Sequence, residues 1–331
     1  MIELVLDHAD LARVRFAHSP IREAVTSLLV LQDPRRQPMY GRWLSTVRPQ
    51  LGGLELELLV ALAPAGRYLP SFLLPAPTRP WPGLTEELDA VTAAHPGVVR
   101  AELDLVHEGR PLPGVLQALY QDPAAHLPAV AKALERYWQV AVEPVWPRMR
   151  ALGAADLAYR MERFADGGLT CVLERLHPDV TFAGDVLQID KPHHCSHRLD
   201  LTGTGIVLVP CAFIWPTVLV ECCGVDQPSL TYPPRGVAEL WEDTASEVTD
   251  PLSALIGRTR AALLATLGLP RTTSQLAAQL DLSPPAVSQH LKVLKDTALI
   301  TGRRRGRMVL YQRTPTATTL LETIRTHERT G

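Results

Sequence analysis

The spacing of hydrophobic positions changes twice along this chain, and each change marks a different kind of structure. Up to about residue 180, apolar side chains recur every three or four residues, as in amphipathic helices, whereas from Asp185 they recur every second residue, as in strands. After Pro251 the helical spacing returns. We therefore predict an α+β fold, with a mainly helical N-terminal body of residues 1–250 that includes an antiparallel β meander, and a C-terminal domain of residues 251–331.

Local signals place the elements of the body. Ser19 and Pro20 supply an N-cap and a first-turn proline for the clearest helix, and Asp33 followed by Pro34 ends it. The same spacing predicts further helices at 40–47, 54–62, 84–93, 128–146, 156–176 and 236–247. Between about 185 and 233, short apolar runs separated by turn residues predict the β meander.

A proline-rich run at 64–82 interrupts these helices. Proline has no N–H and a fixed φ, so the run cannot form a regular helix or a central strand. Within it, Phe72, Leu73 and Leu74 have the character of buried residues. We interpret the run as an extended segment wrapped over the body; a PxxP motif for a protein partner is the alternative.

The C-terminal domain begins after Asp250, because a residue before proline is disfavoured in a helix. Apolar spacing predicts a helix at 252–267 and a short helix capped by Thr272 or Thr273. A second helix follows, with Ser283 as its N-cap. We expect a β-hairpin after this helix, with four arginines at its tip, and a closing helix at the end of the domain.

The helix after Ser283 has two different faces. At about 100° per residue, Val287, Leu291 and Leu294 form one apolar stripe, which we expect to be buried. The residues that face away from the stripe or flank it are Pro285, Ser288, Gln289, Lys292 and Lys295. Glutamine can pair with an adenine edge, serine can reach a base or a phosphate, and lysine suits phosphates. The pattern favours a DNA-reading helix; His290 is interpreted as a half-buried structural residue, with a DNA contact as the alternative.

The charge distribution agrees with a nucleic-acid reader at the C-terminal end. The net charge is −2, but residues 251–331 hold 12 Lys and Arg against 4 Asp and Glu, which leaves 21 against 31 in residues 1–250. A basic domain joined to an acidic body is typical of a nucleic-acid-binding protein. The hairpin arginines suit the minor groove or flanking phosphates, with a solvated charge cluster as the alternative.

The run LSPPAVSQHLKVLKDTALITGRRRGRMVLYQ resembles the winged helix-turn-helix of the ArsR/SmtB family of bacterial transcription regulators. DLARVRFAHSPIREAVTSLLVLQDP and YPPRGVAELW resemble the long actinobacterial members, whose large N-terminal domain has no assigned function. The resemblance implies a homodimer that binds a double-stranded DNA operator, usually as a repressor released by a ligand. The DNA-binding residues that we predict are Thr273, Ser283, Pro285, Ser288, Gln289, Lys292, Lys295, Arg303, Arg304, Arg305 and Arg307.

The usual metal sites of that family are missing here. Its metal sensors carry a Cys-x-Cys pair on the helix before the recognition helix, or Asp and His ligands on the last helix, whereas no cysteine follows Cys223. In the body, His193, Cys195 and His197 share one face if they lie on a strand, and Cys222 or Cys223 could add a ligand. A metal or redox sensor built on this cluster is our alternative function; a histidine-rich turn with buried cysteines is the interpretation without a metal.

Composition and motif content exclude several other classes of protein. Five cysteines without a CxxC pair argue against a disulfide framework or a zinc ribbon. No apolar run reaches the roughly 18 residues of a membrane span, so we expect a cytoplasmic protein with no membrane partner. Hydrolase and nucleotide-binding motifs are absent, so we expect neither an enzyme nor a cofactor. We therefore predict a DNA-binding transcriptional repressor whose N-terminal domain senses a small-molecule effector.

Overall fold

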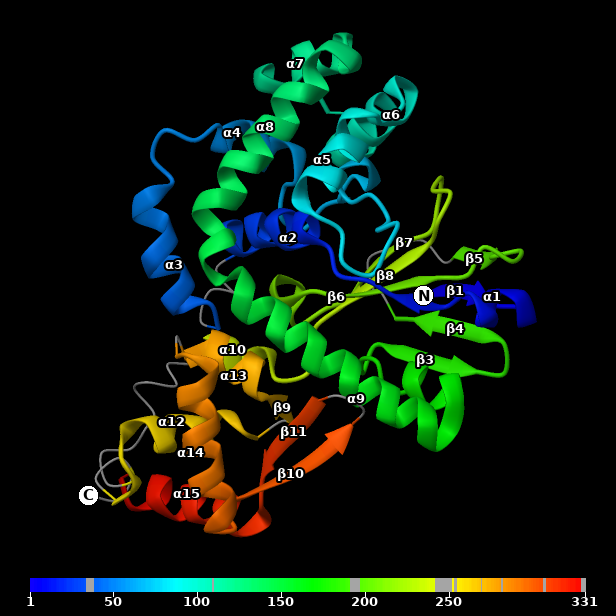
Figure 1. Ribbon diagram of the computed structural model, residues 1–331. Helices are drawn as coiled ribbons and strands as arrows, with labels where there is room; N and C mark the ends of the chain where they lie inside the picture. Colours follow the sequence, from blue (N-terminus) through cyan, green and yellow to red (C-terminus); the bar gives the residue numbers. More distant parts are fainter. Residues whose placement is uncertain are drawn as a thin grey trace. The chain divides into compact units, whose positions relative to one another are not determined.

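The computed structural model describes residues 1–33, 39–108, 110–190, 197–241, 252, 255–268, 270–280, 282–305 and 308–328. It divides into two compact units (Figure 1). Unit 1 comprises Met1–Trp146 and Asp156–Val237, and unit 2 comprises Pro147–Ala155 and Ala238–Gly331. The predicted α+β class is confirmed. Among the described helices, none combines the length and the hydrophobicity that a membrane span requires. The predicted boundary at Asp250 lies outside the described residues and stays a prediction.

Unit 1 contains most of the helices. They are α1 (His8–Ala12), α2 (Pro20–Gln32), α3 (Gly41–Val47), α4 (Leu56–Leu62), α5 (Leu84–Thr92), α6 (Pro96–His107), α7 (Gly114–Gln121), α8 (Pro123–Ala141) and α9 (Trp146–Leu173), whose residues 147–155 belong to unit 2. The helices predicted from 19–33, 40–47, 54–62 and 84–93 are confirmed as α2 to α5. Helix α8 starts at Pro123 and not at Pro128, because the Asp122 side chain accepts a hydrogen bond from the Ala125 N–H and caps it earlier.

Two four-stranded sheets complete unit 1. The first contains β3 (Val180–Ala183), β4 (Val186–Ile189), β1 (Ile2–Val5) and β5 (His197–Asp200), in that order; the second contains β2 (Arg15–Phe16), β6 (Val207–Pro210), β8 (Ser229–Tyr232) and β7 (Leu219–Glu221). The predicted antiparallel meander is wrong in part. β3 pairs antiparallel with β4 and β7 with β8, but β1–β5, β2–β6 and β6–β8 are parallel. Two N-terminal strands lie within the sheets, and the spacing of apolar residues does not report which strands pair.

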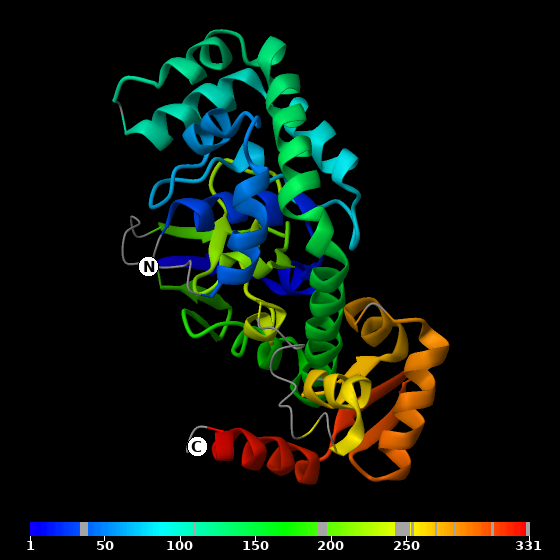
Figure 2. The same ribbon diagram turned by 90° about the vertical axis from the view of Figure 1, so that its left-hand side faces the viewer.

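Helices and sheets enclose the core of unit 1. One apolar cluster joins Leu4 and Leu187 of the first sheet to Leu208 and Leu230 of the second and to Leu173 of α9. Helix α8 packs along α2, α5 and α7 (Figure 2). The proline-rich run 64–82 has only a short 3₁₀ turn, Ser71–Leu73, and its three central apolar residues are buried, as predicted.

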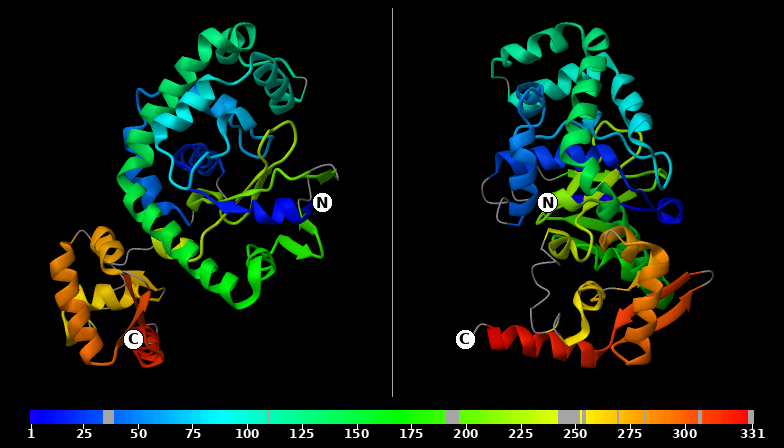
Figure 3. Two further views of the ribbon diagram at one scale, coloured as in Figure 1. Left: turned by 45° about the vertical axis from the view of Figure 1, so that its right-hand side comes forward. Right: turned by 60° about the vertical axis from the view of Figure 1, so that its left-hand side comes forward.

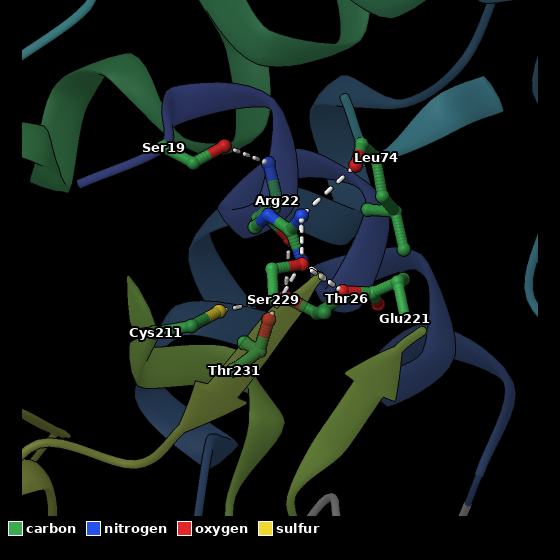
Figure 4. A network of polar contacts seen from close by, with 8 residues as sticks. All are labelled: Ser19, Arg22, Thr26, Leu74, Cys211, Glu221, Ser229 and Thr231. Atoms are coloured by element: carbon green, nitrogen blue, oxygen red, sulfur yellow. Dashed lines mark hydrogen bonds and ion pairs between the residues drawn. The ribbon is translucent and has the colours of Figure 1, made fainter. Parts of the chain in front are cut away.

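Helix α2 carries a buried polar network that its apolar spacing does not predict. The Arg22 side chain is fully buried; its Nη1 donates to Glu221 Oε2 at 2.6 Å and to Thr231 Oγ1 at 2.7 Å. Its Nη2 donates to the Leu74 carbonyl at 2.9 Å and to Ser229 Oγ at 2.8 Å (Figure 4). One guanidinium therefore ties α2 to the proline-rich run and to both β7 and β8.

Two buried carboxyl groups hold the same end of α2. Both Glu23 oxygens accept from the Ala212 N–H, at 2.8 and 2.9 Å, and Oε2 also accepts from the Phe213 N–H at 3.2 Å. Glu87 of α5 accepts from the Ile21 N–H at 2.8 Å. Burial raises the pKa of Glu23 and of Glu87 to about 7. Because the folded-state pKa is raised, each group contributes stability below about pH 4.5 that is lost as the pH rises through about 7.

Glu87→Gln keeps an acceptor for the Ile21 N–H and removes the ionisation. We expect the free energy of unfolding to fall less between about pH 5 and about pH 8 in this variant than in the unchanged protein. The difference should be about 1–3 kcal/mol, since one pKa unit corresponds to about 1.4 kcal/mol. Urea titration followed by tryptophan fluorescence measures it, and five of the six tryptophans lie in unit 1.

Glu86→Gln is the matched control on the same helix. Hydrogen bonds from Thr78 and Arg79 lower the pKa of this carboxyl, so it stays ionised over the whole range tested. Its replacement should leave the pH dependence unchanged. An E87Q protein with the same pH dependence as the unchanged protein would show that Glu87 does not titrate in the folded state.

Candidate nucleic-acid interface

Unit 2 combines short helices with a three-stranded antiparallel sheet. Its helices include α10 (Val237–Trp241), whose first residue belongs to unit 1, and α12 (Arg258–Thr266), α13 (Thr273–Leu280), α14 (Pro284–Asp296) and α15 (Pro315–Glu328). Its strands are β9 (Arg271–Thr272), β10 (Ile300–Arg305) and β11 (Met308–Arg313), in the order β10-β11-β9. Figure 2 shows α15 leading away from the strands. The predicted helix 252–267 is interrupted at Gly257, whose φ of 82° is left-handed, and α12 starts at the next residue.

Caps fix the starts of α13 and α14. Thr272 Oγ1 accepts from the Gln275 N–H at 3.2 Å, and Gln275 Oε1 accepts from the Thr272 N–H at 2.8 Å, so the two residues form a capping box. Ser283 Oγ accepts from the Ala286 N–H at 3.4 Å at the start of α14, as predicted. The Leu282 N–H donates to the Ala277 carbonyl and closes the turn between the two helices.

The two faces of α14 are those that the sequence predicts. Val287, Leu291 and Leu294 are buried in the core of unit 2. The opposite side and its flanks are exposed; we call this side the reading face and define it by Pro285, Ser288, Gln289, Lys292 and Lys295. His290 is half-buried, as predicted. Beyond this helix, Ser283 is exposed and Thr273, the first residue of α13, is half-buried.

The hairpin, which we call the wing, differs from its prediction. Strand β10 runs through Arg305 and pairs Arg303 with Leu310, Arg304 with Val309 and Arg305 with Met308, so these arginines lie in a strand and not in the turn. Because successive strand residues point to opposite faces, Arg303 and Arg304 lie on opposite faces of β10. The side chains of Arg303 and Arg304 are exposed. Arg307 and the side chain of Arg305 lie outside the described residues. Figure 3 (right) shows the wing as a projecting ribbon.

Strand β9 is an element that sequence reasoning misses. Arg271 and Thr272 pair with Tyr311 and Leu310 of β11, which ties the start of α13 to the wing. The Arg271 side chain is buried, and its Nε donates to the Thr266 carbonyl at 3.1 Å. Two residues give too short a pattern to predict a strand; the basic residue directly before a helix cap suggests only a loop.

The histidine and cysteine cluster of the body is only partly described. His193 and Cys195 lie outside the described residues, and so does the side chain of His197, the first residue of β5. Cys222 is buried and Cys223 is exposed, with their Sγ atoms 3.8 Å apart. Burial raises the pKa of Cys222 to about 12. Within the described part of the chain, no three His, Cys, Asp or Glu side chains gather in a way that could hold a metal.

Comparisons with known proteins address the C-terminal part. Residues 255–303 match the family model of a helix-turn-helix domain. The chain is 44% identical over 71 residues to the HTH-type transcriptional regulator Rv2034 of Mycobacterium tuberculosis, which is 21% of this chain and 66% of that protein. It is 40% identical over 81 residues to the HTH-type transcriptional repressor SmtB of the same species, which is 24% of this chain and 55% of that protein. The chain thus spans less than two thirds of either relative.

A solved structure, that of a possible transcriptional regulator for arsenical resistance, aligns with 25% of this chain and 80% of its own chain, at 30% sequence identity and a TM-score of 0.18. The family model and the two sequence relatives agree with the resemblance that the sequence predicts. The C-terminal part of this chain therefore contains a helix-turn-helix domain of the ArsR/SmtB type.

Proposed function

We propose that this protein is a DNA-binding transcriptional repressor whose reading face enters the major groove. The observation that carries the proposal is the exposed polar side of α14, which lies opposite a buried apolar stripe and next to a basic wing. The names of the two sequence relatives, a transcriptional regulator and a transcriptional repressor, support it. The excess of Lys and Arg in residues 251–331 supplies the attraction to phosphates.

The proposed contacts divide into two kinds. Gln289 is long enough to pair with the N6 and N7 groups of an adenine, and Ser288 beside it can reach a base or a phosphate. The remaining proposed contacts are to the backbone: Thr273, Ser283, Pro285, Lys292, Lys295, Arg303, Arg304, Arg305 and Arg307. We infer that two copies of the chain bind an operator with two half-sites, as a symmetric dimer would.

Alanine at Arg303, Arg304 and Arg305 together should weaken DNA binding at every sequence. The logarithm of the binding constant should also fall less steeply with the logarithm of the salt concentration, because each lost phosphate contact reduces that slope by about 0.9. Gln289→Ala should instead relax the preference at one base position, at about 1–3 kcal/mol. Fluorescence anisotropy on selected and scrambled duplexes at several salt concentrations measures both effects.

Lysine at the same three wing positions is the matched control, since it keeps the charge and should keep the salt dependence. A wing-alanine protein with unchanged salt dependence would remove the wing from the interface. A Q289A protein with unchanged base preference would remove Gln289 from base reading.

The N-terminal body is proposed to sense a small-molecule effector. The helix-turn-helix model matches residues 255–303, yet unit 1 forms a separate compact unit with its own core. A DNA reader needs no such body, so we infer that the body binds a ligand and shifts the protein between states that differ in operator affinity.

Linkage gives this proposal a quantitative test on the full chain. A compound that binds the body should raise the unfolding temperature and lower the affinity for the operator by a measurable factor. Saturating operator should lower the affinity for that compound by the same factor, because coupling between two ligands is reciprocal. Thermal-shift screening finds the compound, and titration calorimetry with and without operator measures the two factors. A compound that binds with the same affinity in both titrations is not an effector.

The second candidate, a redox or metal sensor, rests on the 3.8 Å between the Sγ atoms of Cys222 and Cys223. It predicts that hydrogen peroxide weakens operator binding, that a thiol reductant restores it, and that Cys223→Ser is insensitive. Cys171→Ser, at a half-buried cysteine elsewhere in unit 1, is the matched control and should respond like the unchanged protein. This candidate is wrong if peroxide does not change operator binding and if elemental analysis of the untagged protein finds no stoichiometric metal.

A further inference from the structure

The side chain of Val293 on α14 is exposed and does not belong to the apolar core of unit 2. Its exposed fraction is 43%, and among the described residues of unit 2 only Leu255 is another large apolar side chain that is exposed to this degree. Its neighbours Leu291 and Leu294 are buried, so the core of unit 2 is complete without it. Its carbonyl oxygen accepts hydrogen bonds from the N–H and the hydroxyl of Thr297, and these bonds do not involve its side chain.

Valine is also an unfavourable choice for an exposed helix position. Its branched Cβ restricts χ1 and lowers its helix propensity relative to alanine, lysine or glutamine. Contact between an exposed isopropyl group and water is also unfavourable in free energy. Neither the stability of the helix nor its solubility therefore accounts for a valine at this position.

The place of Val293 on the helix relates it to the reading face. Pro285, Gln289 and Val293 recur every four residues and all three are exposed, so they form one row along the helix. At about 100° per residue, Val293 is turned by only about 40° from Gln289. The Cβ atoms of residues four apart lie about 6 Å from each other. Because successive base pairs are about 3.4 Å apart, the two side chains can face base pairs one or two steps apart.

We propose that Val293 is a specificity-determining residue that contacts the C5-methyl group of a thymine, one or two base pairs from the adenine that Gln289 reads. This inference rests on the proposed function of α14 and names a further part of the sequence that it reads. The thymine methyl is the one apolar group that the major groove presents, and an apolar side chain is its natural partner. A rigid β-branched group suits this contact, since little rotamer freedom is lost when it binds.

The residues around Val293 set the limits of this contact. Asp296, three residues further along α14, is exposed, and a carboxylate cannot lie close to DNA phosphates without repulsion. The base-reading part of the helix therefore ends near Val293. Lys292, directly before it, is exposed and can neutralise a phosphate on the flank of the same groove.

The test removes single methyl groups from the DNA and leaves base pairing intact. Duplexes selected from a random library by the full-length protein are synthesised with each thymine replaced in turn by uracil. For the unchanged protein, we expect one thymine per half-site at which uracil weakens binding about fourfold, as the loss of one buried methyl group predicts. Val293→Ala should bind the thymine duplex about fourfold more weakly and lose the discrimination between thymine and uracil at that position.

The controls separate this inference from the proposed function. Gln289→Ala should lose its adenine preference and keep the discrimination at the thymine, while alanine at position 293 favours the helix, so unit 2 should unfold at an equal or higher temperature. If the unchanged protein selects and binds DNA but ignores every uracil, or if V293A keeps the same uracil profile, the inference is wrong and DNA binding stands. If the full-length protein selects no sequence at all, the proposed function itself fails.

Discussion

The buried stripe of α14 is the constraint on which the candidate site depends. Val287, Leu291 and Leu294 are at most 1% exposed and belong to the same core cluster as residues of α12, α13 and α15. Rotating the helix by one residue, about 100°, would bring this stripe out of the core, so its orientation is fixed. Gln289 and Lys292 therefore point outwards because of what the other side buries. The backbone that carries the reading face is therefore held in place by the core behind it.

Unit 1 is organised by a different kind of interaction, a buried ion pair. Arg22 and Glu221 are both buried, and Arg22 Nε and Glu221 Oε1 have no hydrogen-bond partner within the described part of the chain. Apolar side chains of similar volume often give at least equal stability in such places. The pair is therefore weak evidence for added stability. What the pair supplies is a fixed arrangement of α2 against β7 and β8, because each charge can be satisfied only while these elements stay together.

The residues that sequence reasoning predicts best are those whose role is local. The Ser283 cap and the apolar stripe of α14 depend on neighbours a few residues away, and both are where the sequence places them. The burial of Arg22 could not be predicted, because helical spacing assigns a charged residue to the solvent side and its partners Glu221 and Thr231 lie in strands about 200 residues later. The role of Gly302 also depends on a neighbouring strand: a Cβ there would lie 3.1 Å from the Tyr311 ring, so this glycine allows close strand packing.

The wing arginines and the reading face are suited to different parts of DNA binding: the arginines to affinity, and the reading face to base preference. Since Arg303 and Arg304 lie on opposite faces of β10, one flat surface cannot contact both at once. A ribbon that carries charge on both faces suits the two phosphate strands that border a groove and supplies attraction without base recognition. In the function proposed above, base recognition is left to the row of α14 that contains Gln289 and Val293, because contacts to base edges depend little on salt. Salt should therefore change how tightly this protein binds DNA far more than which sequence it prefers.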